Sequence, residues 1–330
     1  MDYRLAAGFD LFAKRSYNAL YSVYDSSTVG GTLRLGVPIT DEISFSPRYS
    51  LYQSKVIIPN DASRPYNDCT VPIPGVTDNN CVSNGEASLA VKEIAGARMI
   101  SQVGYSLTYN TLDNPRNPTQ GLYAEFKQDV AGAGGDARFV RTTGEVRVFY
   151  PVWDDVVGFV KGQAGNVTAF GGDQLRVTDN FNLGPSLVRG FAPGGIGPRD
   201  VSMPGSNNNS LGGTNFVGGT VELQFPMFGM PKDLGLKGAV FADAGTLFGY
   251  EGKMNFSNPL VDCVYGNGVS VQGNCIKLGD SDKPTLRSSV GASLLWASPL
   301  GPIRFDYAFV LSKAKTDVGQ AFRFSGGGAF

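Results

Sequence analysis

The chain has no histidine among its 330 residues. Ser-His-Asp and Cys-His catalysis therefore lack their base, and His-based metal sites lack their ligand. Gly132-Ala-Gly-Gly-Asp-Ala137 matches the loose G-x-G-x-x-A dinucleotide pattern, but it joins two alternating segments, which favours a glycine hairpin. Asp154-Asp155 lies in a turn, where carboxylates are usually solvated. We expect a protein that is not an enzyme, with no catalytic residue, no metal and no cofactor.

Long apolar runs and charged residues are also scarce. No run of about 18 apolar residues is present, which excludes a helical membrane span. Only 17% of the residues are charged and the net charge is -1, so the chain lacks the excess of positive charge that is typical of proteins that bind nucleic acid. Glycine (44 residues) and aromatic residues (21 Phe, 14 Tyr) are abundant instead. With a mean hydropathy of -0.08, this composition suits strands that alternate apolar and polar residues, in a membrane barrel or in a soluble sandwich or barrel.

Four cysteines lie in two polar loop segments, as the pairs Cys69, Cys81 and Cys263, Cys275. Neither pair has the C-x-x-C spacing of a zinc site. Of the three possible connectivities, pairing within each loop is the simplest, and each bridge would stabilise its loop by ~3 kcal/mol in the chain-entropy model. Such bridges indicate an oxidising compartment or the cell surface. The alternative is four unpaired loop thiols.

The N-terminal segment, residues 1–10, is not a signal peptide, because it has no basic region, no unbroken apolar core and no cleavage site. If the protein is exported, we expect the chain to be a mature or truncated piece.

Alternation with a period of two predicts about twelve strands, of the length that crosses a bilayer at a tilt. The predicted strands are residues 3–11, 28–37, 42–55, 97–109, 121–131, 137–150, 156–170, 214–225, 235–248, 286–297, 303–311 and 321–330. A short helix is predicted at 86–94, within a loop. Short connections alternate with longer ones, and the three longest are near 57–96, 171–213 and 249–284. The sequence therefore predicts an all-β fold, an antiparallel up-and-down transmembrane β-barrel that fills residues 1–330 as one domain.

The last predicted strand ends in an aromatic residue. Phe322, Phe324 and Phe330 have even numbers and so fall on one face of the predicted strand, whereas Arg323 falls on the other. This pattern predicts a row of side chains that faces lipid. An ordinary core strand that ends in Phe is the alternative.

One long connection carries a single arginine between apolar neighbours, in Val188-Arg189-Gly190-Phe191. A loop of this length can fold back into a barrel, where an unpaired guanidinium is very costly. Glu222 and Asp243 are the candidate partners, since the alternation of apolar and polar residues places each at an inward-facing position of its strand. The alternative is a solvated arginine and two unrelated acids.

Several motifs occur in a fixed order along the chain. They are Thr111-Leu-Asp-Asn-Pro-Arg-Asn-Pro-Thr-Gln-Gly121, Val188-Arg-Gly-Phe191 with Ile196-Gly-Pro198, Phe241-Ala-Asp-Ala-Gly245, Trp296-Ala-Ser-Pro-Leu-Gly-Pro302 and the aromatic C terminus. This ordered set resembles the BamA family of outer-membrane β-barrel assembly factors, within the surface antigen and POTRA-barrel superfamily. The resemblance implies that Arg189 packs in the lumen against Glu222 and Asp243. It also implies sixteen strands and periplasmic POTRA domains, so we expect a piece that starts near strand five.

The resemblance further implies a protein of the bacterial outer membrane that inserts and folds other barrels without ATP or cofactor. Its partners would be nascent outer-membrane β-barrel proteins, accessory outer-membrane lipoproteins and the lipid bilayer. The implied mechanism is a weak, glycine-kinked final strand that parts from the first strand. A chain without the first strand would not insert clients alone. The alternatives are a two-partner-secretion or translocation-and-assembly pore of the same superfamily, a passive porin, and an adhesin that acts through its loops.

Overall fold

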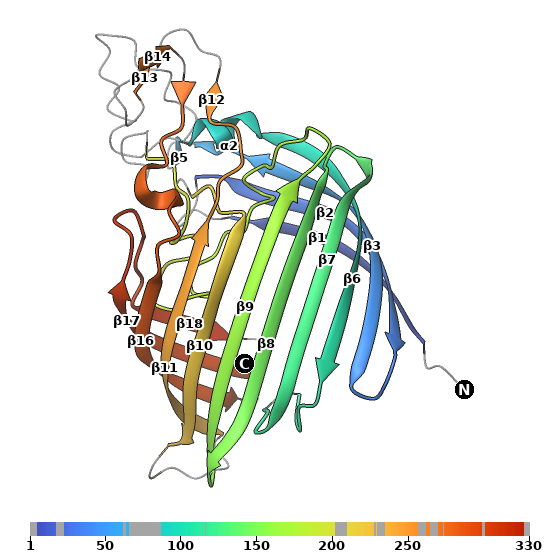
Figure 1. Cartoon of the computed structure of the whole chain (residues 1–330), viewed down its shortest axis with the longest axis vertical. Helices are drawn as coiled ribbons and strands as arrows, with labels where there is room; N and C mark the ends of the chain where they lie inside the picture. Colours follow the sequence, from blue (N-terminus) through green and yellow to red (C-terminus); the bar gives the residue numbers. More distant parts are fainter. Residues whose placement is uncertain are drawn as a thin grey trace.

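The structure is a computed structural model of the whole chain. It describes residues 5–17, 23–61, 64–65, 87–115, 117–201, 210–227, 229, 235–256, 262–264, 270–272, 274–298 and 301–326, and of 60–61, 64–65, 255–256, 262–264, 270–272 and 274–275 it describes the backbone only. Twelve of the described strands form one sheet, which curves around an interior (Figure 1).

The sheet strands follow each other in space as they do along the chain. They are β1 (Ala6–Ser16), β2 (Asp25–Pro38), β3 (Ile43–Ile57), β6 (Gly96–Asn110), β7 (Gly121–Gly135), β8 (Phe139–Trp153), β9 (Val156–Ala169), β10 (Asn215–Pro226), β11 (Leu236–Phe248), β16 (Arg287–Ser298), β17 (Gly301–Ser312) and β18 (Phe322–Gly326). Every neighbouring pair is antiparallel. The predicted all-β, up-and-down arrangement and its twelve strands are therefore confirmed. In the described chain β1 and β18 are the ends of the sheet, and the total of sixteen strands stays a prediction.

Short elements lie in the long connections. They are β4 (Asn60–Asp61), β5 (Arg64–Pro65), α2 (Leu89–Glu93), β12 (Asn255–Phe256), β13 (Asp262–Val264), β14 (Ser270–Gln272), β15 (Asn274–Cys275) and the 3-10 helix η2 (Gly279–Asp282). The helix α2 begins after Ser88, whose hydroxyl accepts a hydrogen bond from the N–H of Ala90. No helix in the described ranges has the length and the apolar character that crossing a membrane requires.

The predicted alternation separates an outer face from an inner face. On β10, Val217 and Val221 are 53% and 60% exposed, whereas Glu222 is 2% exposed. On β18, Phe322 and Phe324 are 54% and 58% exposed, as expected for side chains that face lipid. The third residue of the predicted aromatic row, Phe330, lies outside the described residues.

The C-terminal end of β7, which is rich in glycine, differs from the prediction. The segment from Gly132 was expected to form the turn of a hairpin, but β7 continues to Gly135, and the turn follows it. Gly132, Gly134 and Gly135 have positive φ angles of 139°, 103° and 88°. A register shift between Ile100 and Gln102 lets this irregular end of β7 pair with β6.

The predicted disulfides stay predictions. Cys69 and Cys81 lie outside the described residues. The strands β13 and β15 contain Cys263 and Cys275, but only their backbone is described.

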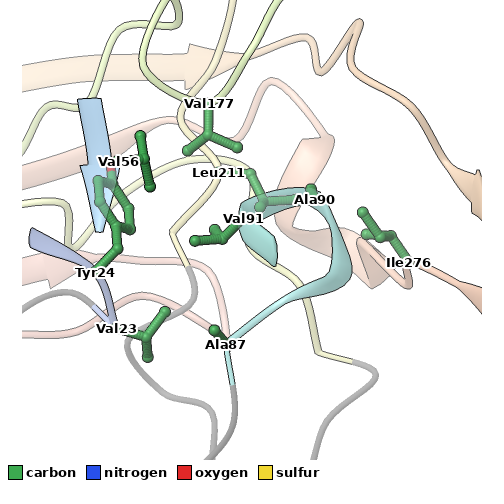
Figure 2. Packing of buried hydrophobic residues seen from close by; sticks show 9 residues of the cluster. All are labelled: Val23, Tyr24, Val56, Ala87, Ala90, Val91, Val177, Leu211 and Ile276. Carbon is green, nitrogen blue, oxygen red and sulfur yellow. The ribbon is translucent and has the colours of Figure 1, made fainter. Parts of the chain in front are cut away.

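Loops at one end of the sheet share a hydrophobic cluster (Figure 2). Ala90 and Val91 of α2 pack there with residues from the ends of three connections and of β3. The buried members of the cluster are Val23, Tyr24, Val56, Ala87, Ala90, Val91, Val177, Leu211 and Ile276. This cluster joins the long connection after β9 to the other loops at the same end.

Candidate functional site

The connection between β9 and β10 enters the interior of the curved sheet. Its residues Leu187, Val188, Phe191 and Ile196 are at most 2% exposed, and they pack on Leu247 of β11. Backbone hydrogen bonds from Leu187 and Val188 to the carbonyl oxygen of Gly184 form a tight turn just before the arginine. We call residues 184–198 the interior loop.

Gly190 lets the interior loop approach the wall of the sheet. Its φ angle is +92°, which L side chains rarely adopt. A Cβ atom at this position would lie 3.0 Å from Cγ2 of Val310 and 3.2 Å from Cβ of Ala308. Glycine is therefore required here both by the backbone conformation and by the contact with β17.

Arg189 binds Asp243 of β11 through three hydrogen bonds. Its backbone N–H and its Nε both donate to Oδ2, at 2.9 and 2.7 Å, and its Nη2 donates to Oδ1 at 2.7 Å. The guanidinium carbon also lies 3.4 Å from the ring centroid of Phe241, two residues earlier on the same face. One carboxylate thus fixes both the backbone and the side chain of Arg189.

Glu222 of β10 is shared by two arginines. Nη1 of Arg189 donates to its Oε2 at 2.6 Å, and Nη2 of Arg304 on β17 donates to the same oxygen at 2.6 Å. Nε of Arg304 also donates to Asp306 at 2.7 Å. All five side chains are largely buried, with two cations facing three carboxylates. We call Arg189, Glu222, Asp243, Arg304 and Asp306 the interior ion cluster.

The interior loop is also joined to the segment that precedes β18. The N–H of Ala192 donates to the carbonyl oxygen of Val318, and the N–H of Val318 donates to that of Gly195, both at 2.9 Å. The N–H of Gln320 donates to the carbonyl oxygen of Gly190 at 2.8 Å. The loop therefore adds a short antiparallel ladder on the inside of the barrel wall.

A second buried ion pair holds that segment in place. Arg287 of β16 is fully buried and donates through Nε and Nη2 to the two oxygens of Asp317, at 3.0 and 3.1 Å. The N–H of Ala314 donates to the same carboxylate at 2.6 Å. The Arg287–Asp317 pair thus clamps the β17–β18 connection to the neighbouring strand.

The start of the β9–β10 connection has a similar anchor on β6. Arg98 of β6 is 3% exposed and donates to Asp173 and Asp179, each at 2.7 Å. Near the end of the interior loop, burial lowers the pKa of Arg199, and the charge of Asp317 opposes this shift. The long connection is therefore fixed by ionic contacts at several points along its length.

Of the residues predicted from the sequence, the structure brings Arg189, Glu222 and Asp243 together. Val188 and Phe191 pack beside them, and Gly190 makes the close approach. Sequence reasoning missed Arg304, Asp306, Arg287 and Asp317. The parity of residues 303–311, which places Arg304 and Asp306 opposite Phe305 and Tyr307, was a signal that pointed to the first two.

This arrangement can hold a loop against the wall of the sheet. Each carboxylate of the interior ion cluster accepts a hydrogen bond from an arginine. No cluster of three or more metal-ligating side chains occurs in the described part of the chain. The site is best understood as an anchor.

Comparison with known proteins gives a consistent result. The family model described as the Omp85 superfamily domain matches residues 1–330. The chain is 32% identical over 322 residues to the outer membrane protein assembly factor BamA of Neorickettsia risticii, a match that covers 97% of this chain and 36% of that protein. It is 28% identical over 338 residues to BamA of Neisseria meningitidis serogroup B, covering 99% of this chain and 40% of the relative. The chain thus spans less than half the length of both relatives.

A solved structure shares the fold. The crystal structure of BamA from Haemophilus ducreyi lacking POTRA domains 1–3 superposes with a TM-score of 0.71 at 20% identity, over 97% of this chain and 58% of that chain.

Proposed function

Because this chain belongs to the Omp85 superfamily, we propose that it is the barrel of an assembly factor that inserts and folds β-barrel proteins. It lies in the bacterial outer membrane. The observation that carries the proposal is the match over nearly the whole chain to proteins named as outer membrane protein assembly factors. The interior ion cluster supports it, since the Val-Arg-Gly-Phe motif that suggested this family is seated on the wall of the barrel.

The proposed mechanism uses strand pairing and no covalent chemistry, so we propose that the protein is not an enzyme. The last strand predicted from the sequence contains the run Gly326-Gly-Gly328, and glycine within a strand weakens it. A strand weakened in this way can separate from a neighbour more easily than the other strands. A client strand would then pair with the exposed edge, and local thinning of the bilayer would lower the barrier to insertion.

The partners in this proposal are nascent outer-membrane β-barrel proteins, with accessory outer-membrane lipoproteins that bind the assembly factor. Purification of the protein from outer membranes, with mass spectrometry of the associated proteins, tests the second group. Recovery of no lipoprotein above the level found with an unrelated barrel would count against it.

The activity is tested by diluting a urea-unfolded client barrel into liposomes and following its folding by heat modifiability on gels. Liposomes that contain the protein should fold the client faster than empty liposomes. No acceleration would overturn the proposed function.

Conductance in planar bilayers separates this function from that of a pore. With the interior loop held in place by the interior ion cluster, the current steps from single channels should be small and brief. Steady conductance would instead support a passive porin or a secretion pore. Deletion of residues 57–96 addresses the adhesin alternative, because an assembly factor should keep client folding when this loop is shortened.

A further inference from the structure

A row of uncharged polar side chains crosses the outer face of β6 to β10. Tyr105, Gln128, Thr142, Asn166 and Asn215 are direct cross-strand neighbours in the sheet register. Thr142, Asn166 and Asn215 lie near the end of β8, β9 and β10 that bears the long connection, which is the extracellular side in barrels of this kind, whereas Tyr105 and Gln128 lie further along β6 and β7. We call these five residues the polar row.

The polar row is hydrogen-bonded within itself and still has donors to offer. The hydroxyl of Tyr105 donates to Gln128, and Nε2 of Gln128 donates to Thr142. Nδ2 of Asn166 donates to Asn215, and Nδ2 of Asn215 donates to Thr214. Each amide nitrogen carries two hydrogens, and in the described chain each donates one of these bonds. The row is thus suited to a ligand that supplies acceptor oxygens.

Next to the polar row the outer face is hollowed. Two adjoining hollows of about 540 and 470 Å3 share Phe126, Gly144, Ala164 and Val217 in their lining. The second hollow extends to Thr142, Asn166 and Asn215 of the polar row. The hollows therefore form one groove that begins at the polar row and runs away from it over β7 to β10.

Small residues create the groove. A Cβ atom built at Gly144 or Gly162 would meet no atom within 4 Å, and neither glycine has a positive φ angle. Phe126, Val146 and Val217 beside them are 41%, 43% and 53% exposed. Glycine within a strand weakens the strand and often marks a place where a ligand approaches closely. Nothing in the local backbone requires glycine at these two positions.

We propose that this groove binds one acyl chain of a membrane lipid, with the carbonyl oxygen of the chain's linkage at the polar row. The groove is continuous with the lipid-facing surface of an outer-membrane barrel, so an acyl chain is its available occupant. A concave wall contacts such a chain on more sides than a convex one does, which adds dispersion contacts. At the edge of the hydrocarbon layer, an amide N–H gains from bonding a carbonyl oxygen rather than remaining unpaired.

The charges of the lining residues favour an acyl chain over a phosphate headgroup as the occupant of the groove. No lysine or arginine is among the described residues that line the two hollows. The two acids in the lining, Glu125 and Glu145, contact it from inward-facing positions, where they pair with Lys127 and Arg147. The groove therefore matches an uncharged chain with an acceptor oxygen, and not an ionic group. This inference does not depend on the proposed assembly activity.

Native mass spectrometry of the protein released from nanodiscs tests the proposal. The probes are a diacyl phosphatidylethanolamine and its dialkyl ether analogue, with equal chains and the same headgroup. The unaltered protein should retain the diacyl lipid about tenfold better, as expected for the loss of one or two hydrogen bonds. Equal retention of the two lipids would overturn the carbonyl contact.

A second experiment fills the groove with larger side chains. The double variant Gly144→Val and Gly162→Val should fold, because both side chains enter open space, and it should lose the retained diacyl lipid. Ala292→Val, on the outer face of β16, is the matched control and should retain it. Undiminished retention by the double variant would overturn the site. A benzophenone placed at position 217 should crosslink to lipid, and a crosslink to polypeptide instead would overturn the choice of occupant.

Discussion

The backbone N–H of Gln320 donates to the carbonyl oxygen of Gly190 at 2.8 Å. Gly190 makes the close approach of the interior loop to the wall, and Gln320 lies two residues before β18. The bond therefore joins the loop directly to the segment that leads into the last described strand. Arg189, next to Gly190, is held by carboxylates of β10 and β11, so one short loop connects three parts of the sheet.

Reversing the charge of Arg189 should release the interior loop. Arg189→Glu adds a fourth acid to the three carboxylates of the interior ion cluster, and we expect the loop to become sensitive to protease and the barrel to unfold at lower urea concentration. Adding Asp243→Arg should restore part of the stability, because the ion pair is rebuilt in the opposite sense. Asp243→Arg alone should be as harmful as Arg189→Glu. If the double variant is no better than the worse single variant, direct pairing is not the source of the stability.

Neutralising Glu222 should cost more than neutralising a partly exposed acid with a similar number of partners. Glu222→Gln leaves Arg189 and Arg304 without their shared carboxylate, and removing one partner of a buried pair costs roughly 3–5 kcal/mol. Glu145 also faces two cations, Arg147 and Lys161, but it is 22% exposed. Glu145→Gln should therefore cost about 1 kcal/mol or less. Equal losses in urea unfolding of the two variants would show that burial of the cluster adds nothing.

The ladder between the loop and residues 318–320 predicts that Arg189 and Asp317 are energetically coupled. Arg189→Ala and Asp317→Asn should each speed amide hydrogen exchange in β18, and the double variant should add less than the sum of the two. Asp129→Asn, which breaks the pair with Arg48 on the inner face of β3 and β7, is the control and should leave exchange in β18 unchanged. Additive effects of Arg189→Ala and Asp317→Asn would argue against coupling through the ladder.

A turn outside the membrane should give a pH-dependent contribution. The hydroxyl of Thr119 and nearby backbone N–H groups bond Asp113 and lower the pKa of its carboxyl from 3.8 to about 2. A carboxyl with a lowered pKa stabilises the fold above its unfolded pKa, and this contribution is lost as the pH falls through the folded value. Asp113→Asn should therefore lower the melting temperature at pH 7, and the difference from the unaltered protein should shrink between about pH 4 and pH 2. A difference that is constant over this range would exclude the carboxylate as its source.

Periodicity predicted much of the fold because each strand buries one face. The exposed Val221 and the buried Glu222 follow directly from that alternation. The extension of β7 to Gly135 was missed because a run of glycines has no side-chain pattern to follow.

The interior site was predicted in part. Parity placed Glu222 and Asp243 on the inner face, and the Val-Arg-Gly-Phe resemblance connected them to Arg189. Parity also places Arg304 inward, but its contact with Glu222 depends on the curvature that brings β17 towards β10, which a one-dimensional pattern does not contain. Asp317 lies in a connection without any period, so its pairing with Arg287 had no signal in the sequence.

The interior ion cluster also sets an order of events during folding. Every carboxylate that binds Arg189, and the segment that bonds Gly190, lies later in the chain than the interior loop. When β9, the strand before the interior loop, has formed, the residues that bind the loop are not yet in place. Contacts between residues distant in the sequence also form slowly. Seating of Arg189 must wait until β10, β11 and the residues before β18 have arrived. A barrel that stalls before its last strand would keep an unlocked loop, which a protease could use to tell unfinished molecules from finished ones.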